Sequence, residues 1–212
     1  MTVIEARDSK KRILDAAISL FARKGYAAVG VREIASEAGV NIAMISYYFD
    51  GKVGILKAII DTFFSQYSQL LVNIDDRDKT LEESVRTVVH RLVQFIRCNT
   101  ELTLVTYNEL PLDVPEIAEM KARKVKALLK KMSGLIRRFG LDPDDILQLT
   151  MVFPSLVAMI FAHFRMRPVL AHVLDVNFDD AYYERLTGTL ATLFFGGIQG
   201  LSARKQKRQK RK

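Results

Sequence analysis

The residues that most clearly suggest a chemistry lie in the stretch 31–52, which reads VREIASEAGVNIAMISYYFDGK. Apolar spacing predicts a helix from Arg32 to Ala38, and Gly39 then provides the left-handed residue that ends a helix and turns the chain. Asn41 is a favourable N-cap for a second helix from Ile42 to Phe49. Helix, glycine turn and capped helix form the helix-turn-helix pattern, whose second helix enters the major groove of DNA. The same spacing also fits an ordinary corner between two helices, so spacing alone leaves both interpretations open.

Several groups of residues in this stretch resemble the DNA-binding motif of TetR/AcrR-type transcriptional repressors. They are Arg32-Glu33-Ile34-Ala35, then Ala38-Gly39-Val40-Asn41, then Tyr47-Tyr48-Phe49 followed by Lys52. The run from Asn41 to Phe49 is most similar to the CecR-like subset of that family. Gly30, Ser46 and Val53-Gly54 depart from the usual pattern, and Gly30 stands where a serine or threonine usually caps the helix.

The resemblance implies a role in DNA recognition for two sets of residues. Base contacts are implied for Arg32, Ile42, Ala43, Met44 and Tyr47, and phosphate contacts for Ser46, Tyr48 and Lys52. A guanidinium binds guanine O6 and N7, whereas apolar side chains read thymine methyl groups or groove shape. Because one motif covers only a few base pairs, we expect a homodimer that places two recognition helices about 34 Å apart on a palindromic operator. The family further implies a repressor that a small-molecule effector releases from DNA.

Composition indicates a folded, all-α protein. The chain has 212 residues, 49% of them hydrophobic, with only 5 prolines and 11 glycines. The resemblance implies an N-terminal three-helix DNA-binding domain over 1–52 and a larger helical ligand-binding and dimerisation domain over 53–201, and the charge of residues 202–212 predicts a disordered basic tail. The last nine residues, 204–212, hold seven basic and no acidic residues and therefore account for most of the net charge of +8.

The cysteine content and the N-terminal sequence predict a cytoplasmic location. Cys98 is the single cysteine, so an internal disulfide is excluded and a reducing compartment fits. The start of the chain, MTVIEARDSKKR, has no apolar core of the kind found in secretory signals.

Hydrophobic periodicity, caps and breakers place the helices. They are expected at Arg7–Arg23, Arg32–Ala38, Ile42–Phe49, Lys52–Leu71, Leu81–Cys98, Glu101–Leu110, Pro115–Phe139, Asp144–Phe164 and Asp179–Gln199. Gly25, after Arg23 and Lys24, and Gly140 are expected to end helices, and Thr80-Leu81-Glu82-Glu83 resembles a capping box that opens one. The stretch Ile146–Phe164 lacks any charged residue and is long enough to suggest a membrane span. A helix buried on all sides, partly by a second subunit, fits its polar residues better, and Pro154 should bend it.

The helical body is expected to contain the effector site and the dimer interface that the family implies. Candidate pocket residues are Phe95, Cys98, Tyr107, Phe153, Met159 and His163, although each also fits plain core. Tyr183, Leu186, Leu190, Leu193 and Gly197 follow a three-four spacing suited to packing against another helix. That stripe fits a dimer interface and internal core equally well. The helix from Lys52 is the expected mechanical link between effector and DNA.

An enzyme and a tail-dependent binder are the alternative functions. The sequence has no Walker loop, no HExxH motif and no paired Glu-x-x-His motif, so we expect no catalysis, no metal and no cofactor. The basic tail by itself would support binding to RNA or to a membrane surface. We expect neither a membrane partner nor a catalytic role.

Overall fold

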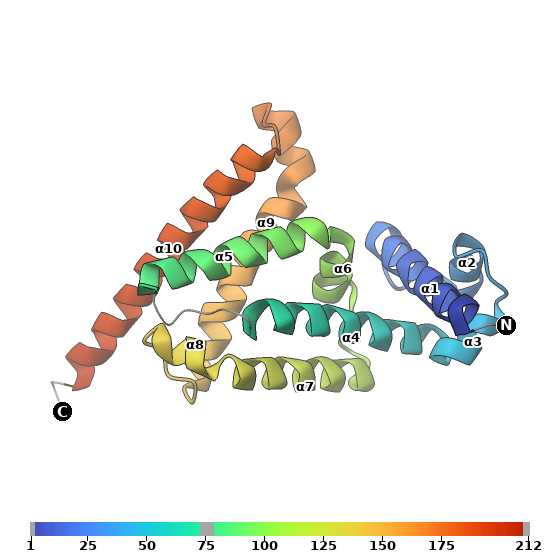
Figure 1. Ribbon diagram of the computed structural model, residues 1–212, viewed down its shortest axis with the longest axis horizontal. Helices are drawn as coiled ribbons and strands as arrows, with labels where there is room; N and C mark the ends of the chain where they lie inside the picture. Colours follow the sequence, from blue (N-terminus) through green and yellow to red (C-terminus); the bar gives the residue numbers. More distant parts are fainter. Residues whose placement is uncertain (1–2, 73–78, 210–212) are drawn as a thin grey trace. The chain divides into compact units, whose positions relative to one another are not determined.

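The computed structural model describes the backbone of residues 3–72 and 79–209, and every regular element within these ranges is a helix (Figure 1). The elements are α1 (Val3–Lys24), α2 (Val31–Glu37), α3 (Ala43–Phe49), α4 (Gly51–Val72), α5 (Leu81–Cys98), α6 (Thr100–Leu104), the π-helix η1 (Val105–Glu109), α7 (Pro115–Lys131), α8 (Ser133–Arg138), α9 (Ile146–Leu174) and α10 (Asp180–Gln209). The prediction of an all-α fold is confirmed.

The chain divides into two compact units. The first unit comprises Met1–Tyr67 and Asn99–Lys126, and the second comprises Ser68–Cys98 and Ala127–Lys212. The division therefore passes through α4 and α7 and does not coincide with the boundary predicted after residue 52. The assignment of functions to separate domains stays a prediction.

The first unit is organised around α1. Its apolar stripe is buried at Ile13, Ala16, Ala17, Leu20 and Phe21. Gly25 ends the helix at φ 81°, as its position after two basic residues predicts. α1 packs against α2, α6 and η1, and the exposed pairs Arg23–Glu37 and Lys24–Glu33 connect it to α2. The buried stripe thus supports the short helix α2.

The segment expected to be one helix from Glu101 to Leu110 is an α-helix followed by a π-helix. The change occurs at Leu104, and Leu110 is extended before Pro111. Lys121 of α7 donates a hydrogen bond to the carbonyl of Thr106 at 3.0 Å and lies 5.5 Å from the ring centre of Tyr107. This side-chain donor satisfies a carbonyl within the π-helical turn, a type of turn that the three-four periodicity of an α-helix does not predict.

The helix predicted from Pro115 to Phe139 is also divided. Met132 has φ −85° and ψ 0°, and it separates α7 from α8. Ser133 and Gly134 follow it directly, and both have lower helix propensity than the residues before them. Gly140, at φ 71°, ends α8 as expected.

The capping box predicted at the start of α5 is present. Thr80 Oγ1 accepts a hydrogen bond from the Glu83 backbone N–H at 3.2 Å, and the Glu83 carboxylate accepts one from the Thr80 backbone N–H at 2.7 Å. Hydrogen bonds from the Thr80 backbone and hydroxyl lower the pKa of Glu83. Orphan donors at the helix start are thereby satisfied reciprocally.

The lowered pKa of Glu83 predicts a pH dependence of stability. Because the folded-state pKa lies below the unfolded value, the contribution is fully present near neutral pH and is lost as the pH falls through the folded-state pKa. Glu83→Gln should therefore flatten the loss of thermal stability between about pH 7 and about pH 3 relative to the unmodified protein. Glu82→Gln, in the same helical turn but outside the capping box, is the matched control, and an equal flattening there would contradict the assignment.

The long helices α9 and α10 form an antiparallel hairpin in the second unit, and both contact α5 (Figure 1). α9 was predicted to end near Phe164 but continues to Leu174 and contains both Pro154 and Pro168. Asp175 then ends it in the left-handed conformation, at φ 48°. Among the described residues, only the segment Gln148–Leu174 is long and apolar enough to cross a membrane, and 39% of its most apolar 18-residue stretch is buried inside the protein.

The prediction of a disordered basic tail is also corrected. α10 was predicted to end near Gln199 and to be followed by disorder from residue 202, whereas the helix continues to Gln209. Lysine, arginine and glutamine are good helix formers, and cations are favourable near the negative end of the helix dipole. Residues 210–212 of the predicted tail lie outside the described residues.

Candidate nucleic-acid interface

The corner between α2 and α3 is a tight turn built on Gly39. Gly39 has φ 62°, a conformation that favours glycine, and its N–H donates to the carbonyl of Ser36 at 3.1 Å. The N–H of Val40 donates to the carbonyl of Ala35 at 3.0 Å. These two bonds satisfy carbonyls at the end of α2 and confirm the predicted glycine turn.

Asn41 satisfies a donor at the start of α3. Its Oδ1 accepts a hydrogen bond from the backbone N–H of Ala43 at 2.9 Å, and its carbonyl accepts one from Met44. The residue immediately before the helix is Ile42, which already has helical backbone angles and whose side chain cannot cap. Asn41 therefore performs the predicted capping chemistry from one position further upstream, in the manner of an Asx turn.

Loss of the Asn41 amide should loosen the entry to α3. We expect Asn41→Ala to lower the free energy of unfolding by about 1 kcal/mol, because the Ala43 N–H loses its side-chain acceptor. Urea titration followed by circular dichroism measures this change. Ser46→Ala, on the exposed side of the same helix, is the control and should stay within about 0.5 kcal/mol; equal effects of the two substitutions would argue against a capping role.

Buried apolar side chains hold α2 and α3 in place. Ile34 is fully buried, and Ile45 and Phe49, one helical turn apart on α3, are 1% and 7% exposed. One face of α3 is therefore buried in the core, and the opposite face is exposed to solvent.

The solvent face of α3 carries most of the predicted DNA contacts. Ile42 is 42% exposed and Tyr47 is 79% exposed, and Ala43 and Ser46 are exposed beside them. Met44 and Tyr48 are partly buried, and the rings of Tyr47 and Tyr48 meet edge to face with centroids 5.0 Å apart. Arg32 is exposed in the first turn of α2. An exposed aromatic beside two exposed aliphatic residues is a surface suited to contact rather than to solvation.

Lys52 has an aromatic environment that sequence reasoning missed. Its ammonium lies 4.1 Å from the ring centre of Tyr26 and 5.9 Å from that of Phe21. Partial burial lowers the pKa of Lys52. Tyr26 directly follows the glycine that ends α1, but no sequence periodicity relates it to Lys52. The pair positions the cation at the beginning of α4.

Gly54 is a second residue whose role the sequence did not reveal. A Cβ atom at this position would lie only 1.4 Å from the carbonyl oxygen of Phe49. The end of α3 and the first turn of α4 thus approach too closely for any side chain. The signal in the sequence is a glycine within a helical pattern, which often marks such an approach.

The predicted pocket residues are distributed over both units. Tyr107 belongs to the first unit, whereas Phe95, Cys98, Phe153, Met159 and His163 belong to the second. Phe95 is buried, Cys98 is exposed, and Nδ1 of His163 lies 3.4 Å from the hydroxyl of Tyr182. Partial burial lowers the pKa of His163. A common pocket for these residues stays a prediction.

The predicted dimer stripe on α10 is corrected by the burial of its first half. Tyr183, Leu186 and Leu190 are 2%, 6% and 3% exposed within the single chain, so they pack inside the second unit. Leu193 is 60% exposed, and Gly197 is also exposed. The three-four spacing correctly indicated helix packing, but for the first three residues the internal core is the correct alternative.

The N-terminal region of the chain matches a known protein family. Residues 13–59 match the family model described as bacterial regulatory proteins, tetR family. A probable HTH-type transcriptional regulator of Bacillus subtilis, YttP, is 33% identical over 114 residues, which cover 53% of this chain and 55% of that protein. The match thus spans about half the length of this curated relative. These similarities do not favour an enzyme or a binder that depends on the tail alone.

Solved structures share the fold of most of the chain. FadR of Bacillus halodurans, a fatty acid degradation regulator, has a TM-score of 0.72 and 21% identity, over 89% of this chain and 95% of that one. FadR of Bacillus subtilis, solved in complex with stearoyl-CoA, has a TM-score of 0.69 and 21% identity, over 88% of this chain and 98% of that one. At this level of identity the likeness concerns the fold alone.

Proposed function

We propose that this chain, which belongs to the tetR family of bacterial regulatory proteins, is a sequence-specific DNA-binding transcriptional repressor that acts as a homodimer in the cytoplasm. The observation that supports DNA binding most strongly is the division of α3 into two faces. Ile45 and Phe49 fix one face in the core, whereas Ile42 and Tyr47 lie exposed on a helix held by a glycine turn. A rigid helix with one contact face has the geometry needed to enter the major groove.

The recognition surface has two classes of residue in this proposal. Arg32, Ile42, Ala43, Met44 and Tyr47 contact bases, and Ser46, Tyr48 and Lys52 contact phosphates. The apolar residues read thymine methyl groups and groove shape, whereas Arg32 reads guanine. Membership of the CecR-like subset is part of the proposal and rests on the run from Asn41 to Phe49.

Two substitutions separate base recognition from phosphate attraction. Arg32→Ala should weaken binding to the preferred operator by about 1–3 kcal/mol and relax the preference at one base pair per half-site. Lys52→Ala should lower affinity for all sequences and reduce the salt dependence of binding. Fluorescence anisotropy with matched and substituted operators at several salt concentrations measures both effects. Unchanged binding by both variants would contradict the assignment of these residues.

An exposed stripe along α9 and α10 supports the homodimer. On α9 it consists of Met151, Ser155, Ala158, Ala162, Met166, Val169 and Val173, and on α10 of Thr189, Leu193, Gly196 and Gly200. Successive members are three or four residues apart, so each set occupies one face of its helix. Leu193 and Val173 are 60% and 68% exposed, and the small residues permit close helix approach. This α9–α10 stripe is the surface that we assign to the partner subunit.

The proposed regulation is release from DNA by a small-molecule effector. Long-chain acyl-CoA is the first class to test, because FadR of B. subtilis has the same fold and was solved with stearoyl-CoA. α4 belongs to both units, since the division passes between Tyr67 and Ser68. An effector that prefers one conformation of the body can therefore act on the DNA-binding helices through α4.

The effector proposal is tested by measuring operator binding during titration with stearoyl-CoA, with free CoA and stearate as controls. Saturable loss of operator binding with stearoyl-CoA, at a concentration where neither control acts, is the expected result. Unchanged operator binding up to the solubility limit would exclude this effector class, and the assignment of DNA binding would be unaffected.

A further inference from the structure

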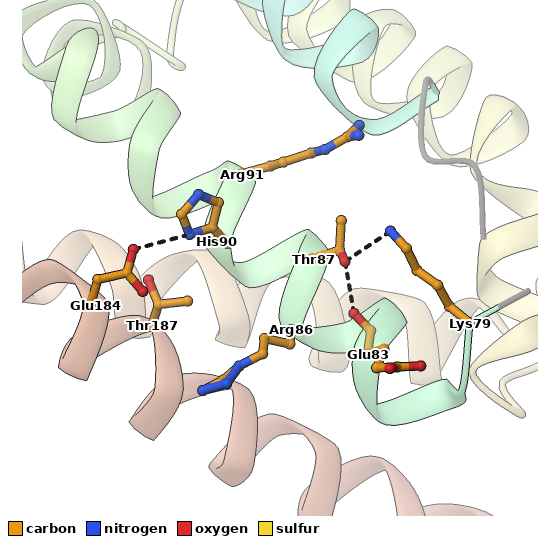
Figure 2. A pocket seen from close by; sticks show the side chains of 8 residues that line it. All are labelled: Lys79, Glu83, Arg86, Thr87, His90, Arg91, Glu184 and Thr187. Carbon is orange, nitrogen blue, oxygen red and sulfur yellow. Dashed lines mark hydrogen bonds and ion pairs between the residues drawn. The ribbon is translucent and has the colours of Figure 1, made fainter.

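A cavity of about 460 Å³ lies along α5 and α10 in the second unit, whereas the residues assigned to DNA belong to the first unit. It is lined by Lys79, Glu83, Arg86, Thr87, His90, Arg91, Glu184 and Thr187. Figure 2 shows that α5 supplies most of these side chains and that Glu184 and Thr187 come from α10. Three permanent cations and a histidine thus line one cavity with only two carboxylates.

Both carboxylates of this cavity already have partners. Glu83 accepts hydrogen bonds from the backbone and the hydroxyl of Thr80, at 2.7 and 2.8 Å. Oε1 of Glu184 lies 4.0 Å from Nδ1 of His90 (Figure 2). The negative charge of Glu83 is therefore partly directed toward the capping box rather than toward Arg86.

Arg86 lines this cavity with an uncompensated charge. Within the ranges that the structure describes, its guanidinium has neither a hydrogen bond nor a salt bridge. A Cβ atom at Gly188 of α10 would lie 3.2 Å from Nη2 of Arg86, so the glycine leaves room for the guanidinium. Arg86 and Glu83 also line an adjoining cavity of about 360 Å³, together with Thr80, Glu82, Gly188, Ala191 and Thr192. Arg86 thus lies where the two cavities meet.

Thr187 provides an independent indication of a ligand. Its side chain is 3% exposed, and its hydroxyl has no hydrogen-bond partner in the described parts of the chain, although it lines the larger cavity. A buried hydroxyl without a partner is unfavourable, and native proteins rarely contain one. A bound oxygen acceptor in the cavity would satisfy it.

We propose that this cavity binds a small phosphate-bearing anion, with Arg86, His90 and Thr187 as its principal donors. A guanidinium presents several N–H donors in one plane, which match the terminal oxygens of a phosphate group. A phosphate accepts more hydrogen bonds than a carboxylate and so fits a site with an arginine, a histidine and a hydroxyl donor. The adjoining cavity leaves space for the organic part of a phosphate monoester. This site is additional to DNA binding and does not depend on it.

Isothermal titration calorimetry of the full chain with inorganic phosphate and with glycerol 3-phosphate tests the proposal, against sodium chloride at matched ionic strength. Saturable binding of at least one phosphate compound is expected. Arg86→Gln should weaken it at least about tenfold and Thr187→Val about threefold. Arg137→Gln, which removes an exposed cation of α8 outside the cavity, should leave it unchanged.

The two probes distinguish the source of the phosphate. Tighter binding of glycerol 3-phosphate indicates an organic phosphate, and tighter binding of the inorganic ion indicates phosphate itself; both support the site. Two results would overturn it: no saturable heat with either compound, or equal affinities of Arg86→Gln and Arg137→Gln. Circular dichroism of each variant verifies that the helical fold is retained.

Discussion

Leu193→Arg is expected to convert the protein from a dimer to a monomer and to lower its operator affinity by roughly 100- to 10 000-fold. Leu193 is 60% exposed in the single chain and lies in the middle of the α10 part of the α9–α10 stripe. In a dimer formed through this stripe, the new guanidinium would be buried without a partner, which is strongly unfavourable. Binding through two linked recognition helices would then be replaced by the much weaker binding of one.

The matched control for this substitution is Leu112→Arg. Leu112 is 52% exposed and lies in the loop before α7, outside the α9–α10 stripe. Sedimentation equilibrium gives the oligomeric state of both variants, and anisotropy gives their operator affinities. A dimeric Leu193→Arg variant with unchanged operator affinity would show that this face of α10 does not contact the partner.

Gly54→Ala adds a single methyl group and is expected to displace the DNA-binding helices. Its Cβ would lie 1.4 Å from the carbonyl oxygen of Phe49, so the end of α3 or the start of α4 has to move. We expect a loss of about 3 kcal/mol in the free energy of unfolding, because the clash is with backbone rather than with a flexible side chain. The displaced α3 should also bind operator at least about tenfold more weakly.

Gly134→Ala separates this clash from the general effect of a methyl group on a helix. Gly134 lies within α8, and a Cβ atom there would meet no other atom within 4 Å. Replacement should therefore stabilise the protein by about 0.5–1 kcal/mol through the higher helix propensity of alanine. Chemical denaturation of both variants tests the comparison. Equal stability of the two variants would show that α3 and α4 do not approach closely at Gly54.

The features that the sequence predicted correctly depend on local chemistry. Gly25 and Gly39 end helices in conformations that favour glycine, and the Thr80–Glu83 capping box requires only residues three apart. Such signals act within one helical turn, so their outcome does not depend on the rest of the fold. The same reason explains why Asn41 was recognised as a capping side chain even though its position relative to α3 is shifted by one residue.

The helices predicted for α9 and α10 were too short, because charged residues that follow an apolar stretch were interpreted as the end of the helix. Arg165 follows the uncharged segment of α9, and basic residues dominate α10 beyond residue 203, yet both helices continue. Arginine and lysine are good helix formers, and on an exposed face they need no apolar partner. Charge patterning alone therefore did not distinguish a solvent-exposed end of a helix from a disordered tail.

Sequence periodicity did not predict which residues distant in the sequence contact each other. A three-four spacing on α10 shows that Tyr183, Leu186 and Leu190 pack against something, but it does not say whether the neighbour is α5, α9 or another subunit. Burial in the single chain decides in favour of internal packing. Tyr26 beside Lys52 is a similar case, because the contact requires the relative placement of α1 and α4.

Selection of DNA from a random pool with the purified protein, followed by determination of the mass of the selected complex, measures whether two copies of the chain place α3 in successive major grooves. We expect enrichment of two-fold symmetric sites whose half-sites are about one helical turn apart, with two chains bound to each duplex. Recovery of unenriched sequences, or of asymmetric sites that bind a single chain, would show that the protein does not bind DNA in this dimeric arrangement.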